Sequence, residues 1–213
     1  MNYENERQVL LDAIKKAHQN GLVYYMAGNL SIRTPDNNVL IKPSGRSYEE
    51  MTAEDLVLVD LDGNVLAGKH RPSSETPMHT MVYREIEHVQ AIVHTHSEHA
   101  LICAITNTEI PPFCNELLGF GGLIPLAEFA IPGTIEIGKN AVKALQGPPQ
   151  VKAALLPNHG AIAIGETMAE AFMRAHVLEK MASVYIQAKS MAPVEALSSE
   201  QVENIIEHYS KNK

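Results

Sequence analysis

Apolar residues recur with two different periods along this 213-residue chain. Spacings of three and four residues are typical of amphipathic helices, and short β-branched runs are typical of strands. The predicted helices cover residues 9–17, 77–86, 99–105, 134–145 and 167–189, with a single turn at 52–55 and a last helix from residue 198. The predicted strands cover residues 30–33, 39–42, 56–60, 65–66, 89–93, 153–156 and 161–164.

Turn sequences join several of these strands into hairpins. Asp36-Asn37-Asn38 and Asp62-Gly63-Asn64 each separate two predicted strands, as hairpin turns do. Residues 110–132 are rich in Pro and Gly and predict a loop with one short strand. Hairpins mixed with helices predict an α/β fold of three α/β/α layers, with a central, largely antiparallel or mixed sheet, in a single domain over residues 1–213. The regular βαβ alternation of a Rossmann sheet is missing.

The charge and composition argue against several classes of function. A net charge of -8 does not suit a nucleic-acid surface, which needs a basic footprint. No apolar run approaches the roughly 18 residues of a membrane span, and residues 1–7 are too polar for a signal peptide. Cys103 and Cys114 lie in unlike contexts, which favours free thiols over a disulfide framework. A cytoplasmic protein with no nucleic-acid or membrane partner is expected.

Histidines offer the first candidate site. His94-Thr95-His96 ends a predicted strand, where residues two apart point to the same face and their stems lie about 7 Å apart. Two imidazoles can then converge on one metal ion. Asn158-His159-Gly160 interrupts two apolar strands and could supply a third ligand. The alternatives are surface or helix-capping histidines for the pair and an ordinary turn residue for His159.

Polar loops offer a candidate anion site. Ser73-Ser74-Glu75 directly precedes Thr76-Pro77 and a predicted helix, whose free N–H groups and positive dipole end attract anions. Gly28-Asn29-Leu30-Ser31 and Lys42-Pro43-Ser44-Gly45 lie at strand ends, where small residues let a ligand approach the backbone. These segments could form a phosphate cradle. They could equally be a helix cap and two ordinary turns.

The order of these motifs resembles a known family. Gly28-Asn29-Leu30-Ser31, Pro43-Ser44-Gly45, Ser73-Ser74-Glu75, His94-Thr95-His96 and Asn158-His159-Gly160 look like successive signatures of class II aldolases of the L-fuculose-1-phosphate aldolase type. The resemblance runs from about residue 7 to about residue 189. The same superfamily includes ribulose-5-phosphate 4-epimerases, methylthioribulose-1-phosphate dehydratases and adducin head domains.

The resemblance implies a zinc-dependent aldolase that cleaves a ketose 1-phosphate to dihydroxyacetone phosphate and an aldehyde. By this resemblance, His94, His96 and His159 bind Zn²⁺, with Mn²⁺ or Co²⁺ compatible with the same ligands, and Glu75 is the acid/base. The residues that the resemblance assigns to the substrate phosphate are Gly28, Asn29, Ser44, Gly45, Ser73 and Ser74. Family members are typically homotetramers with active sites at subunit boundaries, which is the expectation here.

Two departures from the family pattern bear on the substrate. Fuculose-type aldolases handle the aldehyde half with a tyrosine after the HxH helix, whereas residues 112–116 here read Pro-Phe-Cys-Asn-Glu. Tyr209 is a candidate for a second, C-terminal tyrosine, and Glu116 is an alternative proton-transfer residue. A sugar with a deoxy or otherwise apolar end is therefore favoured. A 4-epimerase, a dehydratase and a non-catalytic adducin-like interaction module are the alternatives.

Overall fold

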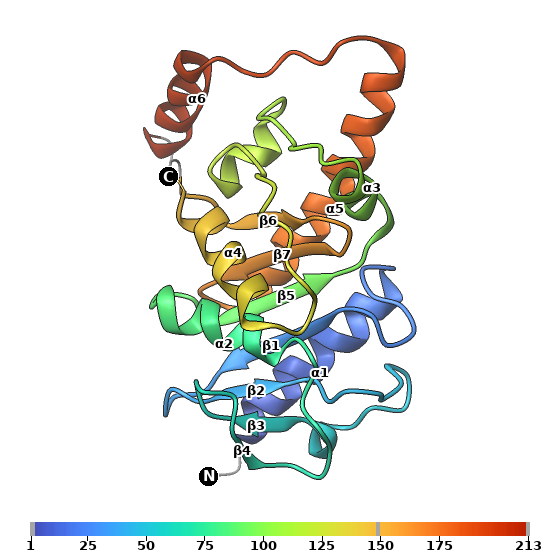
Figure 1. The fold of residues 1–213 in the computed structure, drawn as a ribbon. Helices are drawn as coiled ribbons and strands as arrows, with labels where there is room; N and C mark the ends of the chain where they lie inside the picture. The colour runs from blue at the N-terminus through green and yellow to red at the C-terminus, as the bar shows by residue number, and fades with distance from the viewer. Residues whose placement is uncertain (1–2, 148–149, 212–213) are drawn as a thin grey trace.

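A seven-stranded antiparallel sheet is the centre of the computed structural model, which describes residues 3–147 and 150–211 (Figure 1). Its strands are β1 (Asn29–Arg33), β2 (Val39–Ile41), β3 (Val57–Val59), β4 (Val65–Ala67), β5 (Ala91–Thr95), β6 (Ala153–Leu156) and β7 (Gly160–Gly165). The spatial order is β4-β3-β2-β1-β5-β7-β6, and each neighbouring pair is antiparallel. The α/β fold class predicted from the hairpin signals is confirmed.

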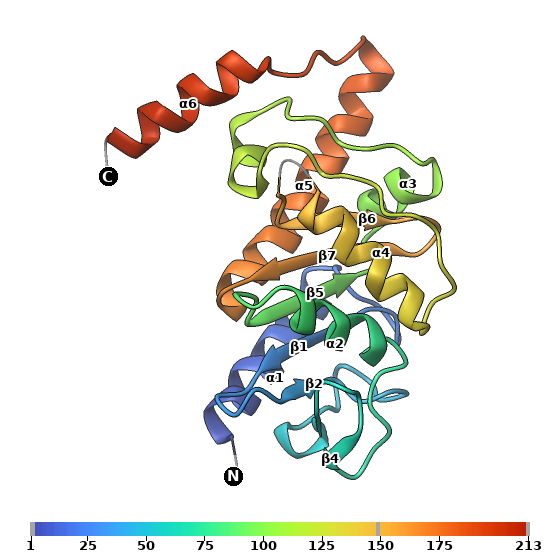
Figure 2. The same ribbon diagram turned by 60° about the vertical axis from the view of Figure 1, so that its left-hand side comes forward.

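Helices cover both faces of this sheet (Figures 1 and 2). They are α1 (Glu4–Gln19), α2 (Thr76–Glu85), α3 (Glu98–Ile105), α4 (Ile135–Gln146), α5 (Met168–Met191) and α6 (Ser199–Lys211), with the 3-10 helices η1 (Ala53–Asp55) and η2 (Asn115–Phe120). One hydrophobic core lies under α1, α3 and α5, and a second lies under α2 and α4. The three predicted layers are therefore present.

Strand alternation decides which side chains reach which core. In β5, Ala91 and Val93 enter the α5 side, while Ile92 enters the α2 side. Residues two apart share a face, so His94 lies on the α2 side together with Ile92. Ser31 pairs with Ile92 in the sheet register, and Asn29 pairs with His94. The polar residues of β1 and β5 therefore meet beneath α2.

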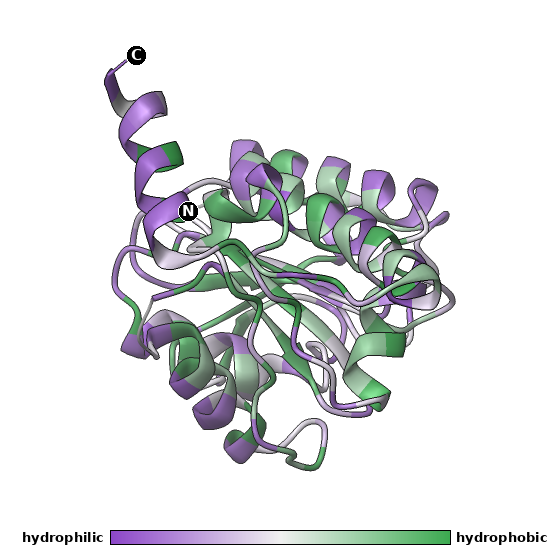
Figure 3. Cartoon of the chain, turned by 90° about the horizontal axis from the view of Figure 1, so that it is seen from above, coloured by the Kyte–Doolittle hydropathy of each residue, from purple (hydrophilic) through white to green (hydrophobic). Residues whose placement is uncertain are grey.

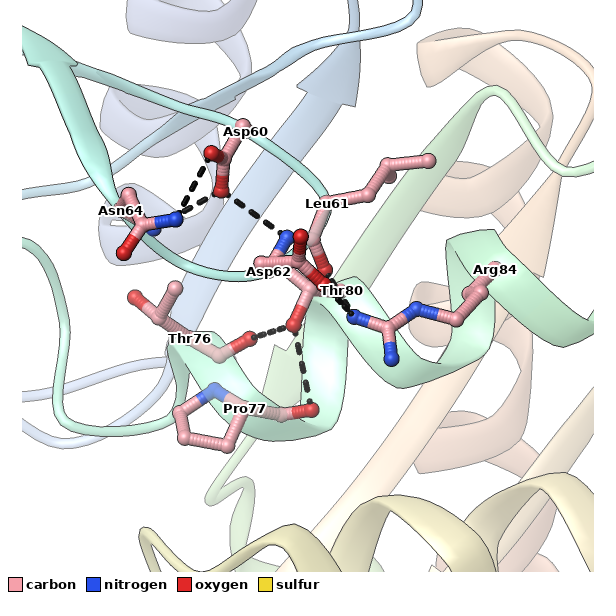
Figure 4. A network of polar contacts seen from close by, with 8 residues as sticks. All are labelled: Asp60, Leu61, Asp62, Asn64, Thr76, Pro77, Thr80 and Arg84. Carbon is pink, nitrogen blue, oxygen red and sulfur yellow. Dashed lines mark hydrogen bonds and ion pairs between the residues drawn. The ribbon is translucent and has the colours of Figure 1, made fainter.

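The turn between β3 and β4 is fastened to α2 (Figure 4). Arg84, near the end of α2, donates to the Leu61 carbonyl and to the Asp62 carboxylate at 2.9 Å. Within the helix, the Thr80 hydroxyl donates to the Thr76 carbonyl at 3.0 Å. The Arg84 contacts join the C-terminal end of α2 to the turn between β3 and β4, and the Thr80 contact lies within the helix.

The last helix stands apart from these layers. α6 follows an extended segment and projects from the sheet and its helices (Figures 1 and 2), and its surface is largely hydrophilic (Figure 3). Its start is a reciprocal capping box: the Ser198 N–H donates to Gln201 Oε1 at 2.8 Å, and the Gln201 N–H donates to Ser198 Oγ at 3.2 Å. The predicted start of this helix at residue 198 is confirmed.

One predicted element is wrong. Residues 110–132 contain no strand, and the backbone there makes only the isolated bridges Ile110–Ile124 and Leu126–Leu155, with η2 between them. Apolar residues such as Leu117 and Phe120 pack into the core under α5 instead of pairing along an edge. Among the described residues, no helix is long and apolar enough to cross a membrane.

Candidate active site

Three histidine side chains meet at the end of β5. His94 lies in the strand, His96 directly follows it, and His159 lies in the turn between β6 and β7. The ring centroids are 4.7 to 4.8 Å apart, and the candidate ligand nitrogens all lie within 4.8 Å of one another. The two distant motifs are therefore brought to one point, as a common metal ion requires.

A glycine makes this meeting possible. Thr95 pairs with Ala161, so the turn that precedes β7 lies beside the end of β5. Gly160 has φ 152°, and a Cβ added there would lie 2.1 Å from the Thr95 carbonyl oxygen. Only glycine allows the two backbones to approach this closely. The Asn-His-Gly turn thus serves both the backbone and the placement of His159.

The imidazoles are neutral, which suits metal binding. His94 Nδ1 lies 2.9 Å from the Ala161 carbonyl oxygen, which can only accept, so Nδ1 carries the proton and Nε2 keeps its lone pair for the cluster. Burial holds the pKa of His94 well below its usual value, and the neighbouring histidines lower it further. Burial likewise lowers the pKa of His96 and, together with His96, that of His159 to about 4. This donor set fits a zinc-like divalent ion.

The backbone after the cluster is held by a carboxylate from α5. Glu179 accepts the backbone N–H groups of His99 and Ala100 at 3.0 and 2.9 Å, and it lies 2.7 Å from His99 Nδ1. It therefore caps α3, the helix that begins two residues after His96. The His96 N–H donates to the Leu22 carbonyl. The turn that carries His96 is thus fixed from two sides.

Glu75 occupies the N-cap position of α2 and is only 5% exposed. Its Oε2 atom is buried without a hydrogen-bond partner. Burial raises the pKa of the carboxyl to about 7, against the opposing effect of the Gly133 N–H. His79, one turn further along α2, lies close enough to His94 to lower that residue's pKa. The start of α2 therefore adjoins the histidine cluster.

The first polar loop packs directly against His94. Gly28 has φ 82°, and an added Cβ would lie 2.6 Å from Val23 Cγ1 and 2.9 Å from the His94 carbonyl oxygen. Asn29 is buried, and its Oδ1 atom has no partner. An amide beside the cluster with an open hydrogen-bonding position is suited to receive a ligand.

The other two polar loops are joined to each other by backbone contacts. The Ser73 N–H donates to the Lys42 carbonyl at 3.1 Å, and the Ser44 N–H donates to the Arg71 carbonyl at 2.9 Å. Ser73 Oγ also accepts the N–H of Glu75 at 3.2 Å, which connects this loop to the N-cap residue of α2. Ser44, Gly45 and Ser74 are exposed. These predicted residues therefore form one surface beside Glu75.

Lys42, which the sequence placed in a candidate phosphate loop, and Tyr48, which it did not single out, lie buried next to these loops. The Tyr48 hydroxyl lies 2.8 and 2.7 Å from the carbonyl oxygens of Ala27 and Gly28. Lys42 Nζ lies 4.6 Å from the centre of the Tyr48 ring, and burial lowers the pKa of Lys42 to about 8. A buried cation with one hydrogen bond, to the Pro43 carbonyl, has donors left for an anion.

Partnerless polar atoms mark the same region. Among the described residues, five buried side-chain atoms lack a partner, and four of them belong to Asn29, Glu75, His79 and His159. Native proteins leave few such atoms unpaired, so a cluster of them points to a ligand. His79 escaped the sequence prediction. Its position four residues after Glu75, on the same helix face, is the signal that could have found it.

Two predicted candidates lie elsewhere in this single chain. Phe113 stacks on Tyr185 at 5.5 Å, and Cys114 contacts Met181, so this segment packs on α5. Glu116 is exposed on η2, and Tyr209 is 57% exposed on the projecting α6. These contacts do not join Glu116 or Tyr209 to the histidine cluster.

Comparison with known proteins agrees with this geometry. Residues 8–186 match the Class II Aldolase and Adducin N-terminal domain family. The chain belongs to this family. It is 34% identical to the 5-deoxy-D-ribulose 1-phosphate aldolase of Bacillus thuringiensis serovar kurstaki over 210 residues, which is 98% of this chain and 97% of that protein.

Two further relatives cover nearly the same span. The chain is 34% identical over 204 residues to the 5-methylthioribulose-1-phosphate/5-deoxyribulose-1-phosphate aldolase of Rhodospirillum rubrum, covering 95% of this chain and 90% of that one. Among solved structures, an L-fuculose 1-phosphate aldolase superposes with a TM-score of 0.91 at 31% identity, covering 97% of each chain. The class II aldolase family predicted from the motifs is confirmed.

Proposed function

We propose that this protein is a metal-dependent aldolase that cleaves a ketose 1-phosphate to dihydroxyacetone phosphate and an aldehyde, with 5-deoxyribulose 1-phosphate as the first candidate substrate. The observation that carries the proposal is the convergence of the three neutral imidazoles of His94, His96 and His159, whose candidate ligand atoms lie within 4.8 Å of one another. Family membership and the aldolases among the relatives support the reaction class.

His94, His96 and His159 hold the metal in this proposal, and Zn²⁺ is the preferred ion. A metal ion held by these residues would supply Lewis-acid chemistry, which would stabilise the negative charge left on the keto fragment when the carbon–carbon bond breaks. Mn²⁺ and Co²⁺ fit the same ligands. Metal analysis of protein purified without chelator is expected to give about one transition-metal ion per chain. Metal-free protein that takes up no added zinc would favour the non-catalytic, adducin-like module.

Glu75 moves the proton in this proposal. A pKa raised to about 7 by burial suits a group that must both accept and donate a proton near neutral pH. The side chain is buried, and its Oε2 atom has no hydrogen-bond partner within the described part of the chain. A Schiff-base route would need a lysine at the reacting carbon, whereas Lys42 lies with the polar loops against Tyr48.

The substrate phosphate binds across the linked polar loops in this proposal. Donors come from Asn29 and from the backbone and hydroxyl groups of the two loops, and Lys42 supplies the positive charge. Gly28 shapes the first loop because a side chain there would collide with Val23 and the His94 carbonyl. The residues proposed to bind phosphate are Gly28, Asn29, Lys42, Ser44, Gly45, Ser73 and Ser74.

The aldehyde end favours a sugar with an apolar terminus. No tyrosine stands at residues 112–116, and Phe113 and Cys114 contact α5. The names of two relatives include 5-deoxyribulose 1-phosphate, and one includes 5-methylthioribulose 1-phosphate. Both sugars lack a hydroxyl on carbon 5, which agrees with the absence of a tyrosine hydroxyl at residues 112–116.

A panel of ketose 1-phosphates tests the proposal. It contains 5-deoxyribulose, 5-methylthioribulose and L-fuculose 1-phosphates, and the release of dihydroxyacetone phosphate is measured. The expected result is fragmentation, fastest for the 5-deoxy sugar. Loss of water would indicate a dehydratase, and a stereochemical change without fragmentation would indicate an epimerase; either outcome contradicts the proposal.

We also propose a homotetramer in the cytoplasm. Two loops near the candidate site expose apolar side chains to solvent. One carries Tyr25 and Met26, next to Gly28, and the other carries Phe129 and Ile131, next to the segment that contacts Glu75. Such patches mark subunit contacts. The free cysteines favour a reducing compartment,. Light scattering during gel filtration measures the assembly, and a stable, fully active monomer would contradict it.

A further inference from the structure

A buried polar chain runs beneath α2 toward the candidate active site. The Tyr83 hydroxyl lies 2.9 Å from Ser31 Oγ, which lies 2.6 Å from His79 Nδ1. All three side chains are buried. They link α2 to β1, on the sheet face that also carries Asn29 and His94. The chain ends at His79 Nε2, which is buried without a partner.

One direction of donation along this chain leaves a donor at its buried end. When the Tyr83 hydroxyl donates to Ser31 and Ser31 donates to His79 Nδ1, Nδ1 is the acceptor of the ring. The side chain is fully buried, which favours the neutral imidazole with a single proton. That proton is then on Nε2, where it forms a donor with no acceptor.

An acceptor without a donor lies one helical turn away. Glu75 Oε2 is buried and unpaired, and the His79 N–H donates to the Glu75 carbonyl at 3.2 Å. Side chains four residues apart lie on the same helix face. A buried donor and a buried acceptor on adjacent turns match each other chemically.

We propose that His79 is a positioning residue whose Nε2–H group donates to the Glu75 carboxylate and fixes its orientation toward the substrate. Ser31 and Tyr83 serve the same end by holding the imidazole in the Nε2–H tautomer. This inference rests on the proposed function of Glu75 as the acid/base. It adds a role for the buried hydrogen-bond chain of Tyr83, Ser31 and His79. These residues act through Glu75 and do not contact the metal or the substrate.

A matched pair of variants tests the proposal by kinetics. His79→Gln keeps an amide donor near the position of Nε2, whereas His79→Asn keeps a polar group near Nδ1 and lacks the donor toward Glu75. The expected result is a kcat about 10- to 100-fold lower for His79→Asn, with KM and metal content unchanged, and recovery of most of kcat in His79→Gln. Equal kcat values for the two variants, or a change in KM alone, would overturn the proposal.

A double-mutant cycle separates this role from a general structural one. In a Glu75→Gln background, His79→Asn is expected to lower the residual kcat less than twofold, because the coupled group is already changed. A full additional loss overturns the proposal. Wild-type turnover of the ketose 1-phosphate panel is measured in parallel. A wild type without aldolase activity refutes the proposed function, whereas the variant ratios refute only the role of His79.

Nuclear magnetic resonance of ¹⁵N-histidine-labelled, zinc-loaded protein provides a readout independent of turnover. The His79 side chain is expected to show the Nε2–H tautomer, with an Nε2 proton protected from solvent exchange. Its resonance should shift in Glu75→Gln and stay unchanged in Glu116→Gln. An Nδ1–H tautomer, or a His79 resonance that does not shift in Glu75→Gln, would overturn the proposal. This test does not require that a variant at residue 79 folds.

Discussion

The sheet end that carries the histidines and the loop region of residues 110–132 are built in contrasting ways. At the sheet end, His94, Glu75 and Asn29 are buried, and Glu75 and Asn29 each have a polar atom without a hydrogen-bond partner. In the loop region, Glu116 is exposed and Phe113 packs on α5. Rigid strands hold groups in place more accurately than loops do, while loops vary more freely. The contrast supports the proposal that the sheet end, and not the loop region, carries the chemistry.

The largest expected effect comes from the carboxylate of the sheet end. Glu75→Gln removes the proton-transfer group but keeps the shape and the hydrogen-bonding atoms. We expect kcat to fall by about 10²- to 10⁴-fold, while metal content stays near that of the wild type. Steady-state kinetics with metal analysis measures both. A variant that keeps full turnover would remove Glu75 from the mechanism.

The next effect tests the close backbone approach that brings the third histidine into place. Gly160→Ala puts a Cβ 2.1 Å from the Thr95 carbonyl oxygen, so β5 and β7 must move apart. We expect a loss of about 2 to 4 kcal/mol in the free energy of unfolding and weaker zinc binding. Denaturant titration and zinc titration measure these.

Gly119→Ala in η2 is the matched control, because an added Cβ there meets nothing within 4 Å. Its unfolding free energy should stay within about 0.5 kcal/mol of the wild type. Equal destabilisation by the two substitutions would contradict the contrast between the two regions.

A smaller effect is expected from the dependence of phosphate binding on pH. Burial lowers the pKa of Lys42 to about 8, so its charge is present below that pH and lost above it. Inhibition by inorganic phosphate should therefore weaken roughly tenfold between about pH 7.5 and pH 9.5. Lys42→Met should bind phosphate weakly at both pH values. The same decline in that variant would show that another group is responsible.

The contribution of Lys42 to stability changes with pH in the opposite sense to its contribution to phosphate binding. Its folded-state pKa lies below the ordinary value of 10.5, so the unfolded chain binds more protons between these two values. The free energy of unfolding from this group therefore rises as pH increases from 8 toward 10.5. Denaturant titrations of wild type and Lys42→Met over this range should diverge in that sense.

The smallest effect is expected in the loop region. Glu116→Gln changes an exposed side chain on η2, so turnover should change less than twofold and stability by less than about 0.5 kcal/mol. The same assays used for Glu75→Gln measure it. A loss comparable to that of Glu75→Gln would make residue 116 part of the acid/base machinery and erase the contrast.

Local patterns along the chain were enough to predict most elements and most of the candidate site. The two-residue period of a strand puts His94 and His96 on one side, and the cap before Pro77 puts Glu75 at a helix start. Both features follow from backbone geometry within a few residues, which does not depend on the rest of the fold. The loop at 110–132 was predicted less well, because the packing of Leu117 and Phe120, not their local sequence, decides its path.

Other features depended on strands and helices that are distant in sequence. His159 reaches His94 only through the register of β7 on β5 and the room left by Gly160. Lys42 meets the Tyr48 ring, and His79 meets Ser31, only after the layers pack. A sequence determines which side chains share a face of one element. The packing of several elements decides which of those faces meet, because their contacts form between residues that no local spacing relates.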